Sequence, residues 1–308
     1  MSTAAAMTTP APPCEVLAWD SEHFDCRVGR IVLGGGGCLD RERLAAVDAW
    51  CRAEAIDCLY FLADAGDPAT AALAEEAGFR LVDLRVTLEG EQRPHPRPLS
   101  HLPPTPPPGE GRQEAGALLF SPLPGIGRGE LGEGPGVRAA LPDDVPALRR
   151  IAAVSHHDSR FYADPHFDRA RCDELYATWI EKSCRAQWAD PAVTVVLVAG
   201  QEGEPLGYIS CQVFPPSPGR REGMGEGGQG GEGRVGEIGL LAVAPAAQRR
   251  GVGGALVSAG LRWLAERGAV RVRVVTQGRN VRAQRLYQAH GLLTRSIGLW
   301  FHRWRGSR

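Results

Sequence analysis

Proline and glycine gather in two segments of the chain and limit where a packed core can form. Residues 91–136 hold 11 Pro and 9 Gly in 46 positions, and residues 215–234 hold 8 Gly and 3 Pro in 20 positions. Such segments bury too little apolar surface to offset the entropy of ordering them. We interpret the first as a linker and the second as an insertion in a loop. We expect the small-residue, Pro-containing stretch 1–13 to be disordered as well.

The block before the linker, residues 14–90, has the periodicity of a small α/β domain. Alternating or continuous apolar residues mark strands, and apolar residues at helical spacing mark helices. Asp40 is the expected N-cap of the first helix and Gly78 the residue that ends the second. The pattern predicts strands over 27–33, 58–62 and 79–88 and helices over 40–55 and 70–77.

The block after the linker, residues 137–308, is longer and alternates in the same way. Its order of elements predicts an α/β (α+β) fold in which a mixed central sheet carries helices on both faces. Asp143 is the expected cap of the first helix. The predicted strands are 137–140, 193–199, 206–214, 237–243, 270–276 and 296–303, and the predicted helices are 143–153, 167–183, 253–267 and 280–290.

Charge and composition exclude several classes of function. The net charge is −1, so no strong field gathers nucleic acid or an anionic membrane. No run of about 18 apolar residues or secretory signal is present. The eight cysteines form no C-x-x-C pair. The adjacent His156, His157 and Asp158 are poorly spaced for one ion. We expect a cytoplasmic, reduced protein without a metal, nucleic-acid or membrane partner.

The region with the clearest chemistry is Gln248-Arg249-Arg250-Gly251-Val252-Gly253-Gly254, between the strand ending at Val243 and a helix beginning near Gly253. Glycine lets a backbone approach a ligand closely, and a helix N-terminus favours an anion. The two arginines add positive charge. The spacing differs from a P-loop, which needs Lys-Ser/Thr, and from the Rossmann pattern. We therefore predict a pyrophosphate site here.

These residues and their neighbours resemble the GCN5-related N-acetyltransferase (GNAT) superfamily. Gln248-x-x-Gly251-x-Gly253-Gly254 is similar to its Q/R-x-x-G-x-G/A signature, and the preceding strand reads Leu-Ala-Val-Ala-Pro. Asn280-x-x-Ala283-x-x-x-Tyr287 is similar to its N-x-x-A-x-x-x-Y helix. The resemblance covers most of residues 137–308, and it implies a GNAT fold and acetyl-CoA as co-substrate.

A closer resemblance is to the TDP-fucosamine acetyltransferase family. It rests on Leu17–Phe24, Ser159–Tyr162, Tyr176-x-x-Trp179-Ile180, Val274–Gln277 and Leu299–Phe301. The family implies that a partial GNAT-like domain precedes the complete one, which would account for block 14–90. It also implies that the acceptor is the amino group of a TDP-linked 4-amino-4,6-dideoxyhexose used for surface polysaccharide. The two Pro/Gly-rich segments depart from the family.

The GNAT resemblance also implies which residues hold the cofactor. Backbone groups of Leu241 and Val243 would hold the pantetheine as an added strand, and the N–H groups of 249–254 would hold the pyrophosphate. Asn280 would contact the pantetheine arm. The expected cofactor-binding residues are Leu241, Ala242, Val243, Gln248, Arg249, Arg250, Gly251, Val252, Gly253, Gly254, Asn280 and Ala283.

Three further roles concern the reaction and the acceptor. Tyr287 is the expected general acid, which protonates the departing thiolate. Glu237 is a candidate general base, although the amine could instead lose its proton through water. Arg160, Phe161 and Tyr162 are candidates for binding the acceptor, with Arg160 on a phosphate and an aromatic ring on a thymine or sugar; packing of a loop would also explain them.

Other readings of the same residues remain open. The acceptor could be another amine, such as a protein N-terminus, a lysine or a small molecule. The chain could also bind acetyl-CoA without catalysis, or be an enzyme disabled by its insertions. Exposed strand edges could pair two copies as a homodimer.

Overall fold

The computed structural model describes residues 14–33, 38–92, 136–215 and 233–306. The predictions made for the N-terminal stretch 1–13, for the linker and for the insertion at 215–234 fall outside these residues, apart from their ends. All eight cysteines are described, and all are free. No helix of the described ranges is long and apolar enough to cross a bilayer.

The described strands form a single sheet in the order β1-β2-β3-β10-β4-β9-β8-β7-β6-β5. Neighbours run antiparallel except for the pairs β2–β3 and β8–β9, which are parallel. The mixed sheet that the periodicity predicts is therefore confirmed. The strands are β1 (Cys14–Val16), β2 (Val28–Ile31), β3 (Cys58–Asp64), β4 (Arg80–Glu91), β5 (Val137–Ala139), β6 (Thr194–Gln201), β7 (Glu204–Phe214), β8 (Arg234–Val243), β9 (Ala269–Gln277) and β10 (Leu293–Trp304).

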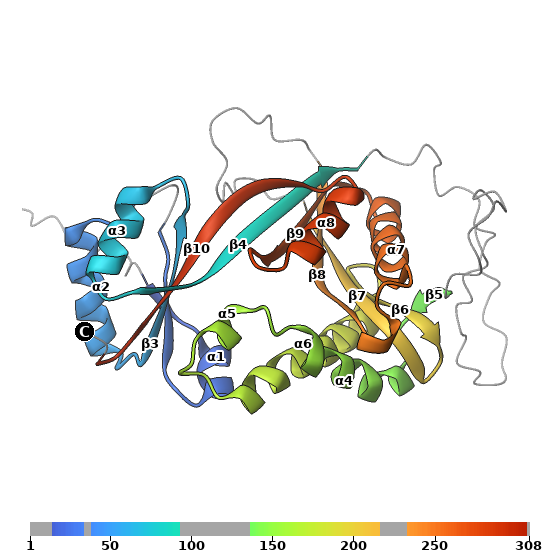
Figure 1. Cartoon of the computed structure of the whole chain (residues 1–308), viewed down its shortest axis with the longest axis horizontal. Coiled ribbons are helices and arrows are strands. Elements are labelled where there is room, and N and C mark those ends of the chain that lie inside the picture. The colour runs from blue at the N-terminus through green and yellow to red at the C-terminus, as the bar shows by residue number, and fades with distance from the viewer. Residues whose placement is uncertain (1–13, 34–37, 93–135, 216–232, 307–308) are drawn as a thin grey trace, which may run out of the picture.

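The two sequence blocks interlock through β4 and β10. The N-terminal strand β4 lies between β9 and β10, and the C-terminal strand β10 lies between β3 and β4. Figure 1 shows these two long strands side by side across the middle of the molecule. Each block thus fills a position in the sheet that the other block leaves open. The division into a smaller domain at 14–90 and a larger one at 137–308 stays a prediction.

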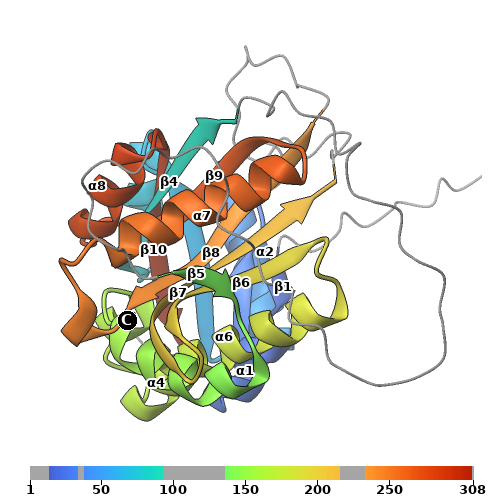
Figure 2. The same ribbon diagram turned by 90° about the vertical axis from the view of Figure 1, so that its right-hand side faces the viewer.

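Helices cover both faces of the sheet. In the C-terminal block, buried side chains of α4, α5 and α6 share one core cluster, while those of α7 and α8 share another on the opposite face. Figure 1 and the turned view in Figure 2 show this separation. The helices are α1 (Ala18–Phe24), α2 (Arg41–Ala53), α3 (Pro68–Glu76), α4 (Val145–Ser155), α5 (Arg160–Ala163), α6 (Arg169–Ala189), α7 (Val252–Glu266) and α8 (Val281–Ala289).

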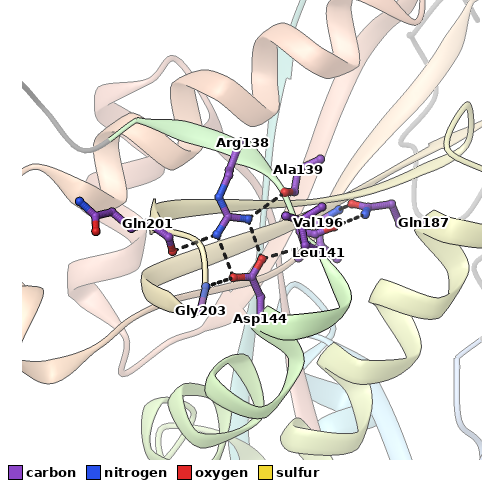
Figure 3. Close-up of polar contacts among 9 residues, drawn as sticks. Arg138, Ala139, Leu141, Asp144, Gln187, Val196, Gln201 and Gly203 are labelled. Carbon is purple, nitrogen blue, oxygen red and sulfur yellow. Dashed lines mark hydrogen bonds and ion pairs between the residues drawn. The ribbon is translucent and has the colours of Figure 1, made fainter. Parts of the chain in front are cut away.

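The start of α4 differs from the prediction. A 3₁₀ turn over Pro142–Asp144 precedes the helix, and the buried residue that organises it is Asp144 rather than Asp143. Asp144 accepts two hydrogen bonds from Arg138, at 2.6 and 2.8 Å, and one from the N–H of Gly203 at 3.2 Å (Figure 3). A buried carboxylate requires such pairing. The ion pair holds the start of α4 against β5, and the bond from Gly203 holds it against the turn between β6 and β7.

Two short elements at the N-terminus were not predicted. Strand β1 has three residues, and α1 has seven with no side-chain cap on its first turn. Elements this short carry little periodicity, and packing against the rest of the fold decides them. The helix predicted at 40–55 is confirmed as α2, and Asp40 caps it by accepting from the N–H of Arg43.

Candidate acetyl-donor and acceptor site

Strand β8 separates from β9 half-way along its length. The parallel ladder between them extends from Arg234 to Ile238 on β8 and ends at Val274 on β9. Beyond it, residues 239–243 of β8 have no ladder with β9, although β8 stays paired with β7 as far as Val243. A gap therefore opens in the middle of the sheet.

A bulge in β8 lies where the gap begins. The register with β7 shifts between Ile209 and Cys211, and the hydroxyl of Ser210 accepts from the N–H of Leu240 at 2.8 Å. An extra residue in one strand bends that strand and increases its twist. The bulge thus gives a local cause for the departure of β8 from β9.

The edge of β8 that faces the gap presents the backbone groups of Leu241 and Val243, of which the Val243 carbonyl accepts from the Gln248 side chain. The N–H of Ala244 donates to Leu206 on β7 at 2.8 Å. Because backbone groups alternate sides along a strand, those of Leu241 and Val243 point away from β7 and into the gap. Ala242, between them, is 4% exposed, and its side chain packs with the α4–α6 core. An extended ligand could therefore pair with this edge.

Helix α7 begins directly after the strand and its loop, and its first turn carries no side-chain cap. Its N-cap is Gly251, in the left-handed region at φ +80°, and the first intrahelical bond runs from Ala255 N–H to the Gly251 carbonyl. Arg249 is also left-handed, at φ +63°. The N–H groups that open the helix therefore lack intrahelical partners, which is the arrangement that binds anions.

The other residues of the loop divide between solvent and core. Arg249 and Arg250 are exposed, while Val252 is 2% exposed. A Cβ on Gly253 would lie 3.3 Å from Leu286 on α8, and one on Gly254 would lie 3.8 Å from His290. The glycines thus allow α8 to pack closely against the start of α7.

Gln248 connects the loop to both neighbouring elements. Its side-chain N–H donates to the carbonyl of Val243 at 3.2 Å, and its side-chain oxygen accepts from Arg282 at 3.0 Å. The strand end, the loop and helix α8 are therefore held together by one side chain.

Helix α8 brings the second predicted motif to the same place. Asn280 is its N-cap and accepts from the N–H of Ala283 at 3.1 Å, so this side-chain oxygen has a structural partner. Tyr287 is 4% exposed, and burial raises its pKa. The cluster around Tyr287 includes Leu241, Val243, Val252 and Ala283. The fold thus gathers the predicted cofactor residues and the predicted acid around the gap.

Glu237 lies on the paired part of β8, before the gap. It accepts from Arg273 on β9 at 2.7 Å, and both side chains are 32% exposed. The carboxylate therefore has an ionic partner within the sheet.

Arg160, Phe161 and Tyr162, the residues predicted to bind the acceptor, belong to α5. This helix lies on the face of the sheet opposite α7 and α8. The guanidinium carbon of Arg160 stands 4.8 Å from the ring centre of Tyr60, 4.4 Å from that of Phe161 and 4.2 Å from that of Trp300. Phe161 is 6% exposed and packs in the core, and the Tyr162 hydroxyl donates to Asp173. The Arg160 guanidinium therefore contacts side chains of two neighbouring strands, β3 and β10.

One buried carboxylate near the gap was not predicted from the sequence. Asp83 on β4 is 5% exposed, and its Oδ1 accepts from the N–H of Leu84 at 2.8 Å. Burial raises its pKa to about 6, although that N–H and Arg279 oppose the rise. The available signal was a single Asp inside the apolar run 81–84. Among the described residues, no group of three potential ligands could hold a metal ion.

The C-terminal region is similar to one known protein family. A model of the acetyltransferase (GNAT) family matches residues 155–292. The chain contains a GNAT acetyltransferase domain. The matched range includes β8, the Gln248–Gly254 loop, α7 and Tyr287, which is the region where the gap lies.

Two curated relatives and one solved structure extend the comparison. The dTDP-fucosamine acetyltransferase of Escherichia coli O6:H1 is 29% identical over 168 residues, which cover 54% of this chain and 63% of that protein. The spore coat polysaccharide biosynthesis protein SpsD of Bacillus subtilis is 26% identical over 165 residues, covering 54% and 49%. These matches span less than two thirds of either relative.

The structural comparison covers nearly the whole chain. A GCN5-related N-acetyltransferase from Sphaerobacter thermophilus superposes with a TM-score of 0.56 over 94% of this chain and 76% of that one, at 16% identity. The GNAT fold expected from the sequence motifs is confirmed, and the similarity extends to the N-terminal block.

Proposed function

We propose that the protein is an N-acetyltransferase that transfers the acetyl group of acetyl-CoA to an amine. The observation that carries this proposal is the gap beside β8, which opens next to the uncapped N-terminus of α7. An extended pantetheine arm suits the backbone groups of Leu241 and the N–H of Val243, which face the gap. A pyrophosphate suits the N–H groups of residues 251–254, with Arg249 and Arg250 adding positive charge.

Tyr287 is the proposed general acid. The helix that carries it packs against the first turn of α7 through Leu286. Because burial raises the pKa of Tyr287, the phenol keeps its proton at neutral pH and can give it to a departing thiolate. Holding the amine and the thioester in attack geometry would supply much of the remaining rate enhancement.

The proposed acceptor is the amino group of a nucleotide-linked 4-amino-4,6-dideoxyhexose. Two curated relatives support it through their names, one as a dTDP-fucosamine acetyltransferase and one as a spore coat polysaccharide protein. Arg160, on the acceptor side of the sheet, offers a guanidinium for a nucleotide phosphate, and Tyr162 offers a half-buried ring.

The test is release of CoA thiol from acetyl-CoA in the presence of different amines. We expect turnover with TDP-4-amino-4,6-dideoxygalactose and none with a lysine peptide or a protein N-terminus. Turnover with the lysine peptide but not with the sugar nucleotide would show that the acceptor is a protein amine. Acetyl-CoA binding without turnover on any amine would indicate a binding module or a disabled enzyme and would contradict catalysis.

A further inference from the structure

The face of the sheet turned toward α5 remains partly open next to the gap. Along β9, Val272, Val274 and Thr276 are buried on the α8 side. The alternate residues Val275 and Gln277 face the other way and are only half-buried. An acceptor that approaches the gap from the face opposite α7 and α8 would therefore meet the C-terminal end of β9.

Residues 156–160 cross this open face from one side of the gap to the other. At one end, His156 Nε2 lies 3.1 Å from the hydroxyl of Tyr208 on β7. At the other end, the guanidinium of Arg160 lies over the ring of Trp300 on β10. The segment forms a wall of the acceptor side and carries Asp158, which is exposed.

Asp83 faces the same space from β4. It stands opposite Trp300 in the antiparallel register, and directly opposite residues project from the same face of a sheet. Two residues along, Arg85 is paired with Gln277, the last residue of β9. One strand, β9, therefore separates β4 from the gap, a spacing of about 5 Å per strand. Asp83 lies two residues beyond the last pair of the β4–β9 ladder, past the end of β9.

The Asp83 carboxylate has weak ionic partners. The side chain is 4% exposed, and Oδ1 lies 3.6 Å from Nε of Arg279, which is beyond hydrogen-bond distance. Apart from the Leu84 N–H, no hydrogen bond to this carboxylate occurs within the described ranges. Arg160 and Asp158 also face it, and Arg160 is engaged with aromatic rings. A buried carboxylate so placed favours an added cation.

We propose that Asp83 binds the ammonium group of the acceptor and takes the proton that this group loses before it attacks the thioester. The inference rests on the proposed function and assigns the base of that reaction to the N-terminal block. Glu237, the base considered from the sequence, is already paired with Arg273 at 2.7 Å. The placement of Asp83 also gives the interlocking of β4 with the C-terminal strands a chemical role.

The protons and electrons balance in this scheme. The ammonium gives one proton to the Asp83 carboxylate, which later passes it to water. The neutral nitrogen forms a bond to the acetyl carbon, and the bond from that carbon to sulfur breaks. The nitrogen then loses its second proton to water, the thiolate gains one from Tyr287, and the resulting phenolate regains a proton from water. The products are an amide, CoA thiol and one released proton.

Replacement of Asp83 in the full chain tests the proposal, using the amine that the acceptor panel shows to be acetylated fastest. For Asp83→Asn we expect the acceptor kcat/KM at pH 7.5 to fall about 100-fold, the scale typical of losing a general base. The loss should shrink toward pH 9.5, where more of the amine is already neutral. The Kd for acetyl-CoA should stay unchanged. Glu91→Gln, eight residues along the same strand, is the matched control and should retain wild-type kinetics.

The pH profile separates this role from a structural one. The wild-type kcat/KM should decline on the acid side near pH 6, where Asp83 becomes protonated. That limb should disappear in Asp83→Asn. It should move to higher pH in Arg279→Gln, because the lost cation no longer lowers the pKa of Asp83.

Three results would overturn the proposal. One is wild-type kcat/KM in Asp83→Asn at pH 7.5. Another is a pH-independent loss in Asp83→Asn accompanied by weaker acetyl-CoA binding. The third is an acid limb that Arg279→Gln leaves in place. A wild-type protein that acetylates no amine in the panel would instead refute the proposed function and this inference with it.

Discussion

At the scale of single residues, Tyr287, the proposed acid, lies in an apolar environment that keeps its phenol protonated. Its ring is buried among the apolar side chains of α7, β8 and α8, so the neutral phenol is favoured over the phenolate. Its position depends on a helix that Asn280 caps and that packs on the start of α7. The residue thus combines a local sequence motif with a tertiary location.

Tyr287→Phe tests this role and keeps the ring in the core. We expect kcat to fall about 100-fold, the order usual for losing a positioned acid, while the Kd for acetyl-CoA changes little. Steady-state kinetics and calorimetric titration measure the two quantities. Full kcat in the variant would remove Tyr287 from the reaction, and a thermal melt near that of the wild type would show that the comparison is between folded proteins.

The residues of the proposed site could be named from the sequence, but their hydrogen-bond and packing partners could not. Asn280 was expected to contact a ligand, and the structure gives its side-chain oxygen a capping role toward Ala283. Phe161 was a candidate for stacking, and its ring packs beside Phe24 and Phe167. Burial of one side chain depends on elements distant in sequence, which a local pattern does not specify.

At the scale of elements, the loop and first turn of α7 form the proposed anion site. The partial positive charge of the helix start acts together with the exposed side chains of Arg249 and Arg250. The local pattern predicted this arrangement because the glycine-rich turn directly joins the end of the strand at Val243 to the start of the helix at Val252. The gap beside β8, in contrast, also depends on the bulge in β8, where the Ser210 hydroxyl of β7 accepts from the Leu240 N–H.

Arg250→Glu should weaken acetyl-CoA binding by reversing charge at this turn. We expect about a tenfold rise in the KM for acetyl-CoA at low ionic strength, and a smaller rise at 0.5 M salt because ions screen exposed charges. Arg262→Glu on the exposed face of the same helix, three turns along, makes the same charge change away from the site. Equal effects of the two variants would show that only net charge matters.

At the scale of the whole molecule, neither block completes its own sheet. β4 lies between two strands of the C-terminal block, and β10 lies between two strands of the N-terminal block. Removing either block would expose long strand edges, which tend to pair with other chains. The ionic contacts between Arg279 and Asp83 and between Arg303 and Asp48 also join the two blocks.

The interlocked strands predict that the blocks unfold together. A protease site placed between residues 110 and 120 should allow cleavage of the folded protein without separating the pieces. We expect the two pieces to co-elute on gel filtration and to melt in one transition, whereas residues 137–308 expressed alone should aggregate. Separation of the pieces, or an active isolated fragment, would contradict this expectation.

Features that depend on short spacing could be predicted from the order of residues alone. Helical and strand periods, the glycine-rich turn before α7 and the Asn280–Tyr287 helix each lie within one or two elements, so local geometry specifies them. The entry of β4 into the C-terminal sheet and the position of Asp83 beside Arg279 are visible only in the folded chain. Those contacts join residues nearly two hundred positions apart, and they form because both sheet edges and buried charges must find partners.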